Sequence, residues 1–488
     1  MAQEPRTTDA QPTDREVPAA ESANSYEVHL SPGRQKMVNL TAAAGLIVCA
    51  VAGFIVGDGP TLWGIAPIVL YGVLCVAGMD MVIATVVSLL GGVLIAQQSP
   101  AEVGDLLALS LTDLVAMIGL IIMLGAGASE VLRVTGVASN IVRSVMSAVG
   151  ERSQRAVQLG IMLSCLVLVT ALGTLAGALA IAAPILIPIA ARIGYTRSAT
   201  AAMMFVGGCA GLALAPFAGS NVAIMSAAEV DYLTYLGVGA APIAILSLVV
   251  AMFLVPWIQN RTKELDDFYG EAEVVPDDQE EPPHARRATW VFAIVLVLSV
   301  IYATVTEAGT AFPLIALPLL AITTGLAARL SLSEIASHVY RGASKLVSIF
   351  VLFWLLAGLF LIIDELAPFD VILDQYGADL QNTSGLVFVL AIALLGWVGV
   401  PGATAAQVVL LDEVFGPLAA TLGISAGAWV IVLLWASKAD TYGPFPNANM
   451  IGAMGLARSN NLKSLLFTGW IILVPACLMY TILLAVMT

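Results

Sequence analysis

The heptapeptide PIAARIG at residues 188–194 returns as PLAATLG at residues 417–423. A second pair lies at nearly the same spacing, because APFAGSN at residues 215–221 corresponds to GPFPNAN at residues 443–449. Self-similarity at a fixed spacing is the signature of an internal repeat, so we predict that the chain consists of two related halves.

A single glycine and a charged linker fix the limits of the two halves. Gly173 pairs with Gly402 at the same spacing as the two heptapeptides. The stretch at residues 259–289 contains EAEVVPDDQEEPP and separates the two copies. We therefore predict repeat 1 at residues 59–258 and repeat 2 at residues 290–488.

The composition is that of a membrane protein. Hydrophobic residues make up 59% of the 488 residues and charged residues only 11%, whereas a soluble domain carries about 25% charged residues. The apolar runs are continuous, which favours helices over an alternating β-barrel. We predict an all-α polytopic membrane protein with about 11 transmembrane helices. A disordered cytoplasmic tail (residues 1–36) and an extra first helix (residues 37–58) precede the repeats.

The residues that could form cofactor or metal sites are poorly placed for that role. The five cysteines all lie in apolar runs, where a thiol behaves as a small hydrophobic group. The three histidines, His29, His284 and His338, all lie outside the apolar runs. We predict no disulfide, no metal site and no cofactor, unless Na⁺ itself is bound as the coupling ion. The net charge of −14 argues against a nucleic-acid partner.

The basic residues indicate the orientation, because short loops rich in Lys and Arg stay in the cytoplasm. Arg34 and Lys36 precede the first apolar run, and no Lys or Arg occurs in residues 366–421. Counting crossings between these points places the N-terminus and the linker in the cytoplasm and the C-terminus outside. The two halves would then insert in opposite orientations, which is typical of secondary transporters. We predict a location in the cell inner membrane.

Each half contains an apolar hairpin, at residues 156–191 and 385–421, followed by a long helix with a break. Each hairpin is short for two crossings and a turn, so re-entrant hairpins are favoured over full crossings. The tips fall at residues 170–174 and 399–404, and the helix breaks at residues 215–221 and 437–449. Lipid cannot satisfy the backbone groups freed at such breaks, so they should line a polar cavity; alternatively, Gly and Pro only permit close packing or a kink. The predicted substrate-binding residues are Thr174, Ser220, Asn221, Thr404, Lys438, Asn447 and Asn449.

Charged residues within apolar segments sharpen this hypothesis, because an ionisable group at the bilayer centre costs roughly 2.5–3.5 kcal/mol. Lys438 and Asp440 fall in the second break, where they could bind a carboxylate and a cation, or only pair with each other. Asp412 and Glu413, on the second hairpin arm, could carry a proton or face outer water. Asp113, early in an apolar run, is open to the same two interpretations. Ion coupling is therefore predicted at Asp440, Asp412, Glu413 and Asp113.

Inverted repeats, hairpins and paired Pro/Asn breaks of this kind resemble the ion transporter superfamily. That group includes divalent-anion:sodium symporters, gluconate-type permeases and some sodium/proton antiporters. The symporters carry Ser-Asn-Thr at both hairpin tips, whereas the tips here are Leu172-Gly-Thr174 and Gly402-Ala-Thr404, which share only the threonine. The resemblance implies a homodimer.

These features predict a secondary active transporter that works by alternating access and is not an enzyme. The first hypothesis is H⁺- or Na⁺-coupled uptake of a small organic anion, with Lys438 attracting a carboxylate. The alternative is a sodium/proton antiporter, because Asp412, Glu413 and Asp440 outnumber the single lysine. An intramembrane aspartyl protease does not need an inverted duplication, and a channel would need a repeated charge ring that the sequence lacks.

Overall fold

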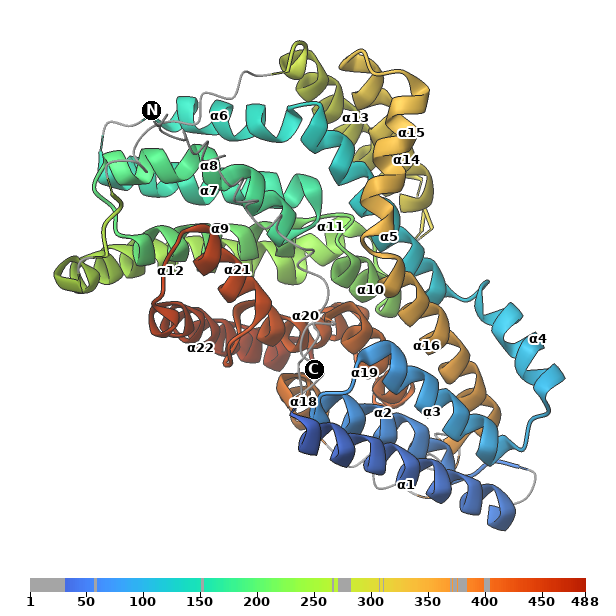
Figure 1. Cartoon of the computed structure of the whole chain (residues 1–488). Coiled ribbons are helices and arrows are strands. Elements are labelled where there is room, and N and C mark those ends of the chain that lie inside the picture. Colours follow the sequence, from blue (N-terminus) through green and yellow to red (C-terminus); the bar gives the residue numbers. More distant parts are fainter. Residues whose placement is uncertain are drawn as a thin grey trace, which may run out of the picture.

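A computed structural model describes residues 31–488 except 57–58, 151–152, 266, 271–281, 307, 310, 369–370, 372–374, 376–383 and 399–403. Residues 1–30 of the predicted tail, residues 271–281 of the linker and the tip of the second hairpin lie outside this part. The first helix begins at Pro32, so the predicted tail boundary at residue 36 is wrong by five residues. The described residues form helices, with one isolated β-bridge between Thr196 and Phe268 (Figure 1). The α-helices are α1 (Pro32–Val56), α2 (Ala66–Ala77), α3 (Met81–Ala96), α4 (Pro100–Ser110), α5 (Leu114–Val134), α6 (Val137–Val149), α7 (Gln154–Leu172), α8 (Leu175–Arg192), α9 (Arg197–Leu214), α10 (Gly219–Ala227), α11 (Tyr232–Tyr235), α12 (Ala241–Thr262), α13 (Ala285–Val305), α14 (Pro313–Ala327), α15 (Leu332–Ser344), α16 (Val347–Leu366), α18 (Gly385–Leu395), α19 (Thr404–Thr421), α20 (Ala426–Tyr442), α21 (Ala448–Leu456) and α22 (Leu462–Met487).

The helices confirm the predicted all-α polytopic membrane class. Within the described residues, nine helices are long and apolar enough to cross a membrane, and six further apolar helices are shorter. The short group includes α2, α3 and α14. Short non-α turns adjoin the α-helices. They are 3₁₀ turns at Leu62–Ile65, Lys263–Leu265 and Gly396–Val398 and a π-helical turn at Leu236–Ala240 between α11 and α12.

The repeat is visible in the local structure of the chain. Helices α8, α9 and α10 begin at positions 175, 197 and 219, and α19, α20 and α21 begin at positions 404, 426 and 448. The spacing is the same in all three pairs and equals that of the two heptapeptides. Left-handed residues also recur at this spacing, since Glu229 (φ 50°) corresponds to Arg458 (φ 56°). Helices α4 and α15 both begin with a Ser-x-x-Glu capping box, which satisfies free backbone amides in the first turn.

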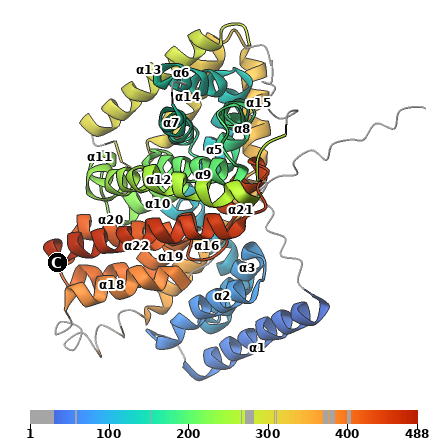
Figure 2. The ribbon, with the colours of Figure 1, turned by 90° about the vertical axis from the view of Figure 1, so that its left-hand side faces the viewer.

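The two halves are interleaved rather than side by side. Helix α5 packs along α16, α15 packs on α5, and α4 packs on α16. The half-helices that follow the breaks cross over, because α10 packs on α19 of the second hairpin and α21 packs on α8 of the first. In both views α9, α12, α20 and α22 lie in the middle, between α6–α8 and α1–α3 (Figures 1 and 2).

Glycines allow the closest helix contacts. A Cβ atom at Gly207 would lie 2.3 Å from the carbonyl oxygen of Met162, and one at Gly211 would lie 2.3 Å from that of Leu166. The Gly-x-x-x-Gly pattern on α9 therefore lets α7 approach backbone to backbone. Helix association in a membrane depends on such packing, since lipid is as apolar as the side chains. This contact holds the first hairpin against the broken helix of its own repeat.

One buried ion cluster joins the two repeats. Glu130 on α5 is 5% exposed and contacts Arg133 Nη2 at 2.5 Å and Lys345 Nζ at 3.1 Å. Lys345 belongs to repeat 2 and lies between α15 and α16. Both cations are about half exposed. The cluster therefore ties the end of α5 to the α15–α16 connection.

Candidate functional site

The first helix break is closed by side chains of the protein itself. Asn221 is fully buried, and its amide donates to the carbonyls of Leu212, Ala213 and Ala215 at 2.8, 3.2 and 2.8 Å. Two hydroxyls complete the set: Tyr232 donates to Leu214 at 2.6 Å, and Tyr235 donates to Ala213 at 2.8 Å. The carbonyls freed where α9 ends are thus satisfied without a ligand, as buried backbone groups must be. Asn221, predicted to bind substrate, uses its donors to hold the break.

Both hairpins approach the broken helix of their own repeat at a glycine. A Cβ at Gly173, the left-handed tip of the first hairpin, would lie 3.6 Å from the amide nitrogen of Ala218 in the first break. A Cβ at Gly396 would lie 2.3 Å from the side chain of Ala436 on α20. The buried Gln407 donates to the carbonyl of Gly396 and so bridges the arms of the second hairpin. The predicted tip residues Gly399–Ala403 lie outside the described part.

The second break is shorter than predicted. Helix α20 continues to Tyr442, and α21 begins at Ala448, with Asn447 as its N-cap. Lys438 and Asp440 therefore lie in the last turns of α20, so the prediction that they sit in the break is wrong. The reason is that the Gly443-Pro444 pair, and not the polar stretch before it, ends the helix. Lys438 is 1% exposed, while the side chain of Asp440 lies outside the described part.

Four carboxylates meet in a cavity of about 500 Å³ at the crossing of α10 and α19, which we call the acidic cavity. Asp412 and Glu413 come from α19, Asp364 from the last turn of α16, and Glu229 from the end of α10. Trp429 on α20 also lines it, and its indole nitrogen donates to Asp412 Oδ1 at 2.7 Å. The remaining lining is small and apolar, and the described lining contains no Lys, Arg or His.

The carboxylates of this cavity act on one another. Asp364, Asp412 and Asp113 lie close enough to Glu413 for their charges to affect it, and Glu229 affects Asp412 in the same way. Asp113 has a structural task as well, because it caps α5 by accepting from the amide of Val115 at 2.7 Å. Asp412 and Glu413 are half-buried, whereas Glu229 and Asp364 are exposed. Like charges that lie close together oppose joint ionisation. The arrangement therefore favours taking up protons or cations.

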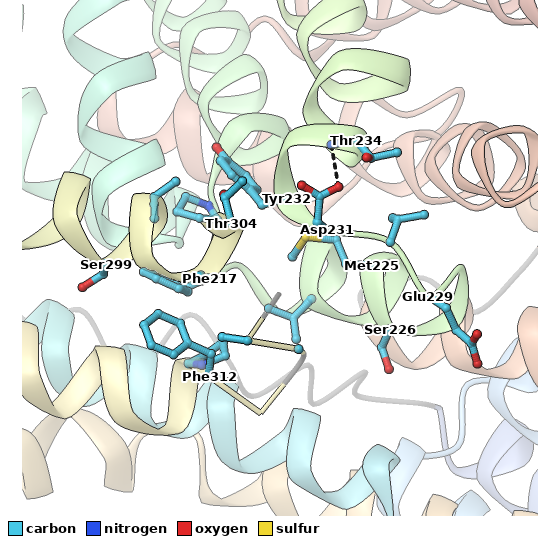
Figure 3. A pocket seen from close by; sticks show the side chains of 18 of the residues that line it. Phe217, Met225, Ser226, Glu229, Asp231, Tyr232, Thr234, Ser299, Thr304 and Phe312 are labelled. Carbon is cyan, nitrogen blue, oxygen red and sulfur yellow. Dashed lines mark hydrogen bonds between the residues drawn. The ribbon is translucent and has the colours of Figure 1, made fainter. Parts of the chain in front are cut away.

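A second cavity of about 840 Å³ lies next to the first, between α10–α11 and α13–α14. Figure 3 shows Phe217 and Phe312 on one side of it, with Asp231 and Glu229 on the other. We call it the aromatic cavity. Its described lining also lacks Lys, Arg and His. Glu229 lines both cavities.

The structure brings together some of the predicted site residues and separates others. Of the predicted ion-coupling residues, Asp412 and Glu413 line the acidic cavity, and Asp113 lies near enough to affect Glu413. The predicted substrate-binding residues line neither cavity. Lys438 lies within α20, and the others lie at or beside the hairpin tips and helix breaks: Thr174, Ser220, Asn221, Thr404, Asn447 and Asn449. The sequence reasoning missed Glu229 and Asp364 as site residues. The signal available for both was a carboxylate directly at the end of an apolar helix.

No three His, Cys, Asp or Glu side chains in the described part of the chain converge as a metal site. The carboxylates of the acidic cavity instead line a space of about 500 Å³. Such a space suits a proton or a partly hydrated monovalent cation. Ca²⁺ and Mg²⁺ take six or more oxygen ligands, water included, close around the ion.

Comparisons with known proteins point to transport. A sequence model of the Na⁺/H⁺ antiporter family matches residues 8–258, just over half of the chain. No curated protein matches. The chain is similar in structure to the YdaH transporter of Alcanivorax borkumensis, at 16% identity and a TM-score of 0.54, over 93% of this chain and 98% of that one. It is also similar to MtrF of Neisseria gonorrhoeae, from a class of antimetabolite efflux pumps, at 12% identity and a TM-score of 0.57, over 93% and 95% of the two chains. The two TM-scores show a shared fold, and at identities this low they show the fold alone.

Proposed function

The chain belongs to the Na⁺/H⁺ antiporter family of membrane transporters, and we propose that it exchanges sodium ions for protons across the membrane. In this proposal the acidic cavity binds the two cations in turn. Asp412 and Glu413 hold either a proton or a sodium ion, and the crossing of α10 and α19 opens the cavity to one side at a time. The matched region contains Glu229 but not Asp412 or Glu413, so their role rests on the geometry.

The observation that carries the proposal is the sign of the charges. The two cavities are lined by five carboxylates and, among the described residues, by no basic side chain. Two like charges about 6 Å apart repel by about 3 kcal/mol at an effective dielectric constant of about 20. A substrate carboxylate in the acidic cavity would meet that repulsion several times over, whereas a cation would be attracted. This difference favours antiport over organic-anion symport.

A proton and a sodium ion can compete for one pair of carboxylates without any large movement of side chains. When Asp412 is ionised, the indole of Trp429 stabilises the charge by donating to Oδ1. Glu413 lies near the carboxylates of Asp364 and Asp412, and in this proposal it carries the proton that is exchanged. Sodium entering the cavity displaces that proton. The pair of carboxylates holds either the proton or the sodium ion, so binding of one ion on a given side of the membrane is linked to release of the other on that side.

Cation-coupled transport of a small organic anion is the second candidate. It is favoured by Lys438, which is 1% exposed on α20 just before the second break. A buried ammonium group is costly in a membrane and often serves function. In this candidate Lys438 attracts the substrate carboxylate, and the acidic cavity carries the coupling ion.

One set of reconstituted vesicles separates the candidates. Purified protein is placed in vesicles that contain a pH-sensitive dye, and sodium is added outside. Antiport predicts that sodium entry drives protons out and that the interior becomes alkaline without any organic solute. If sodium moves no protons while an organic acid accumulates under a sodium or proton gradient, the antiport proposal is wrong. Lys438→Ala should then raise the apparent constant for that acid.

A variant pair tests the cavity itself. The double substitution Asp412→Asn with Glu413→Gln should lower the initial exchange rate at least about tenfold, or about 1.4 kcal/mol, because both groups proposed to hold the cation lose their charge. Glu334→Gln on α15 is the matched control. Hydrogen bonds from the backbone and hydroxyl of Ser331 lower the pKa of Glu334, so this exposed carboxyl is charged throughout the assay. Normal exchange by the double variant would remove the acidic cavity from the mechanism.

A further inference from the structure

Glu229 is the one carboxylate that lines both the acidic cavity and the aromatic cavity among the described residues. It follows the end of α10, the half-helix that packs on α19. In Figure 3 it lies at the edge of the aromatic cavity away from Phe217 and Phe312, with its carboxylate directed away from both. The side chain therefore stands at the junction between the two spaces.

The backbone makes this a position where glycine is the ordinary choice. Glu229 has φ 50°, and its amide donates to the carbonyl of Ser226, while the amide of Val230 donates to that of Met225. This is a Schellman-type helix end, whose left-handed residue is usually glycine because a Cβ is unfavourable there. The chain nevertheless places a glutamate at the junction. Glu229 is exposed, so its carboxylate lies at the open rim that the two cavities share, where glycine would place no charge.

The groups around Glu229 form a line of negative charge. Asp231 lies on the side of the aromatic cavity, where its carboxylate is fixed by the amides of Leu233 and Thr234 at 3.3 and 3.1 Å. Asp412 lies on the other side and is close enough for its charge to interact with that of Glu229. A cavity lined by one sign of charge concentrates the opposite ion. The order Asp231, Glu229, Asp412 leads from the larger cavity to the smaller one.

From this geometry we propose that the aromatic cavity is the entrance for monovalent cations on one face of the protein, and that Glu229 selects cations at its junction with the acidic cavity. The inference rests on the proposed exchange of sodium for protons. Glu229 binds the ion in passing, whereas Asp412 and Glu413 hold it during exchange. The aromatic side chains line the approach and do not coordinate the ion.

Kinetics measured from each side of the membrane test the proposal. Glu229→Gln should raise the apparent Michaelis constant for sodium about tenfold on the side to which the aromatic cavity opens, because the local cation concentration falls. The constant on the other side should change less than about twofold. If the side chain had only a structural role, its replacement would change the sodium constants on both sides of the membrane together. Unchanged constants on both sides for Glu229→Gln would overturn the inference while leaving sodium–proton exchange in the wild type intact.

Two further variants separate this role from folding. Glu229→Gly fits the left-handed backbone, so it should melt no lower than the wild type and still show the one-sided loss of sodium affinity. Arg458→Gly is the matched control, since Arg458 occupies the corresponding left-handed position of repeat 2 and lines neither cavity. Its sodium constants should equal those of the wild type. If Arg458→Gly reproduces the one-sided effect, the backbone and not the carboxylate is responsible, and the inference is wrong.

A chemical probe tests the path without depending on transport. A cysteine placed by Glu229→Cys should react at least about tenfold faster with a cationic thiosulfonate than with an anionic one, because Asp231 and Asp412 remain on either side. Of the five native cysteines, four are buried and Cys477 is half-buried, and the unsubstituted protein supplies the background rate. Adding Asp412→Asn should reduce this preference. Equal rates for the two reagents would show that the junction does not select cations.

Discussion

Replacing Asn221 with alanine separates a structural from a ligand-binding role at the first helix break. The amide of Asn221 has two N–H groups and three acceptors within reach, so it makes about two hydrogen bonds at a time. Without it, Ala213 keeps the hydroxyl of Tyr235 at 2.8 Å. Leu212 and Ala215 keep only long backbone contacts of 3.4 Å each. The variant leaves two buried carbonyls poorly satisfied.

The expected magnitude follows from those two carbonyls. A buried polar group that loses its partner costs about 1–3 kcal/mol, so Asn221→Ala should lower the free energy of unfolding by about 2–4 kcal/mol. Asn449→Ala is the control, because Asn449 is half-buried on α21 and corresponds to Asn221 in the paired seven-residue segments of the two repeats. Asn449→Ala should lower the free energy of unfolding by less than about 1 kcal/mol.

Unfolding of the purified protein in detergent, titrated with a denaturing detergent and followed by tryptophan fluorescence, measures both values. Asn221→Asp adds a second test, since it keeps the shape and removes both donors, and it should be at least as destabilised as Asn221→Ala. If Asn221→Ala unfolds like the wild type while the apparent constant for the transported ion rises, Asn221 binds the ligand. The assignment of its amide to the helix break would then be wrong.

Two predictions concern packing between helices. Gly211→Leu should lower the free energy of unfolding by about 1–3 kcal/mol, because the new side chain would overlap the Leu166 carbonyl. Gly452→Leu is the control. A Cβ at Gly452 would have no atom within 4 Å, so this variant should have little effect in the same titration. Glu130→Gln should destabilise the protein by about 1–2 kcal/mol, a modest effect because Arg133 is half exposed. High salt should shrink the difference between this variant and the wild type, and a difference that is insensitive to salt would rule out a charge effect.

The sequence predicts the repeat well because its markers are local. The Pro-containing heptapeptide at residues 188–194 and the Pro-Phe segment at residues 215–221 keep their spacing in the second half, and the helices that carry them begin at matching positions of the two repeats. The limits of the second break were harder to predict. Polar residues from Ser437 onward resemble a break in the sequence, yet the helix persists to Tyr442, where Gly443 and Pro444 end it.

The acidic cavity could not be predicted in the same way, because it depends on tertiary contacts. Its carboxylates come from the end of α10, the end of α16 and the middle of α19, and only the crossing of α10 with α19 brings them together. Hydropathy identifies Asp412 and Glu413 as unusual within an apolar arm. Glu229 and Asp364, by contrast, look like ordinary helix-end residues until the packing is known. The donors of Asn221 are equally hidden, since the sequence shows an amide at a break and not the direction in which it points.

The asymmetry of the two crossings bears on mechanism. Helix α10 packs on α19 at the acidic cavity, and the repeat-related crossing is that of α21 with α8. When α19 is aligned with α8 from their first residues, Asp412 corresponds to Ala183 and Glu413 to Pro184. The same spacing makes Arg458 the counterpart of Glu229.

The second crossing thus has the same framework of helices and none of these carboxylates. Under the proposed exchange, a duplicated fold that keeps these acids at one crossing of its described helices has its cation site at that crossing. That site takes Glu229 from repeat 1 and the α16 and α19 carboxylates from repeat 2, so a movement of one repeat against the other changes the site directly. Because neither half contains the whole set, neither half alone should exchange cations.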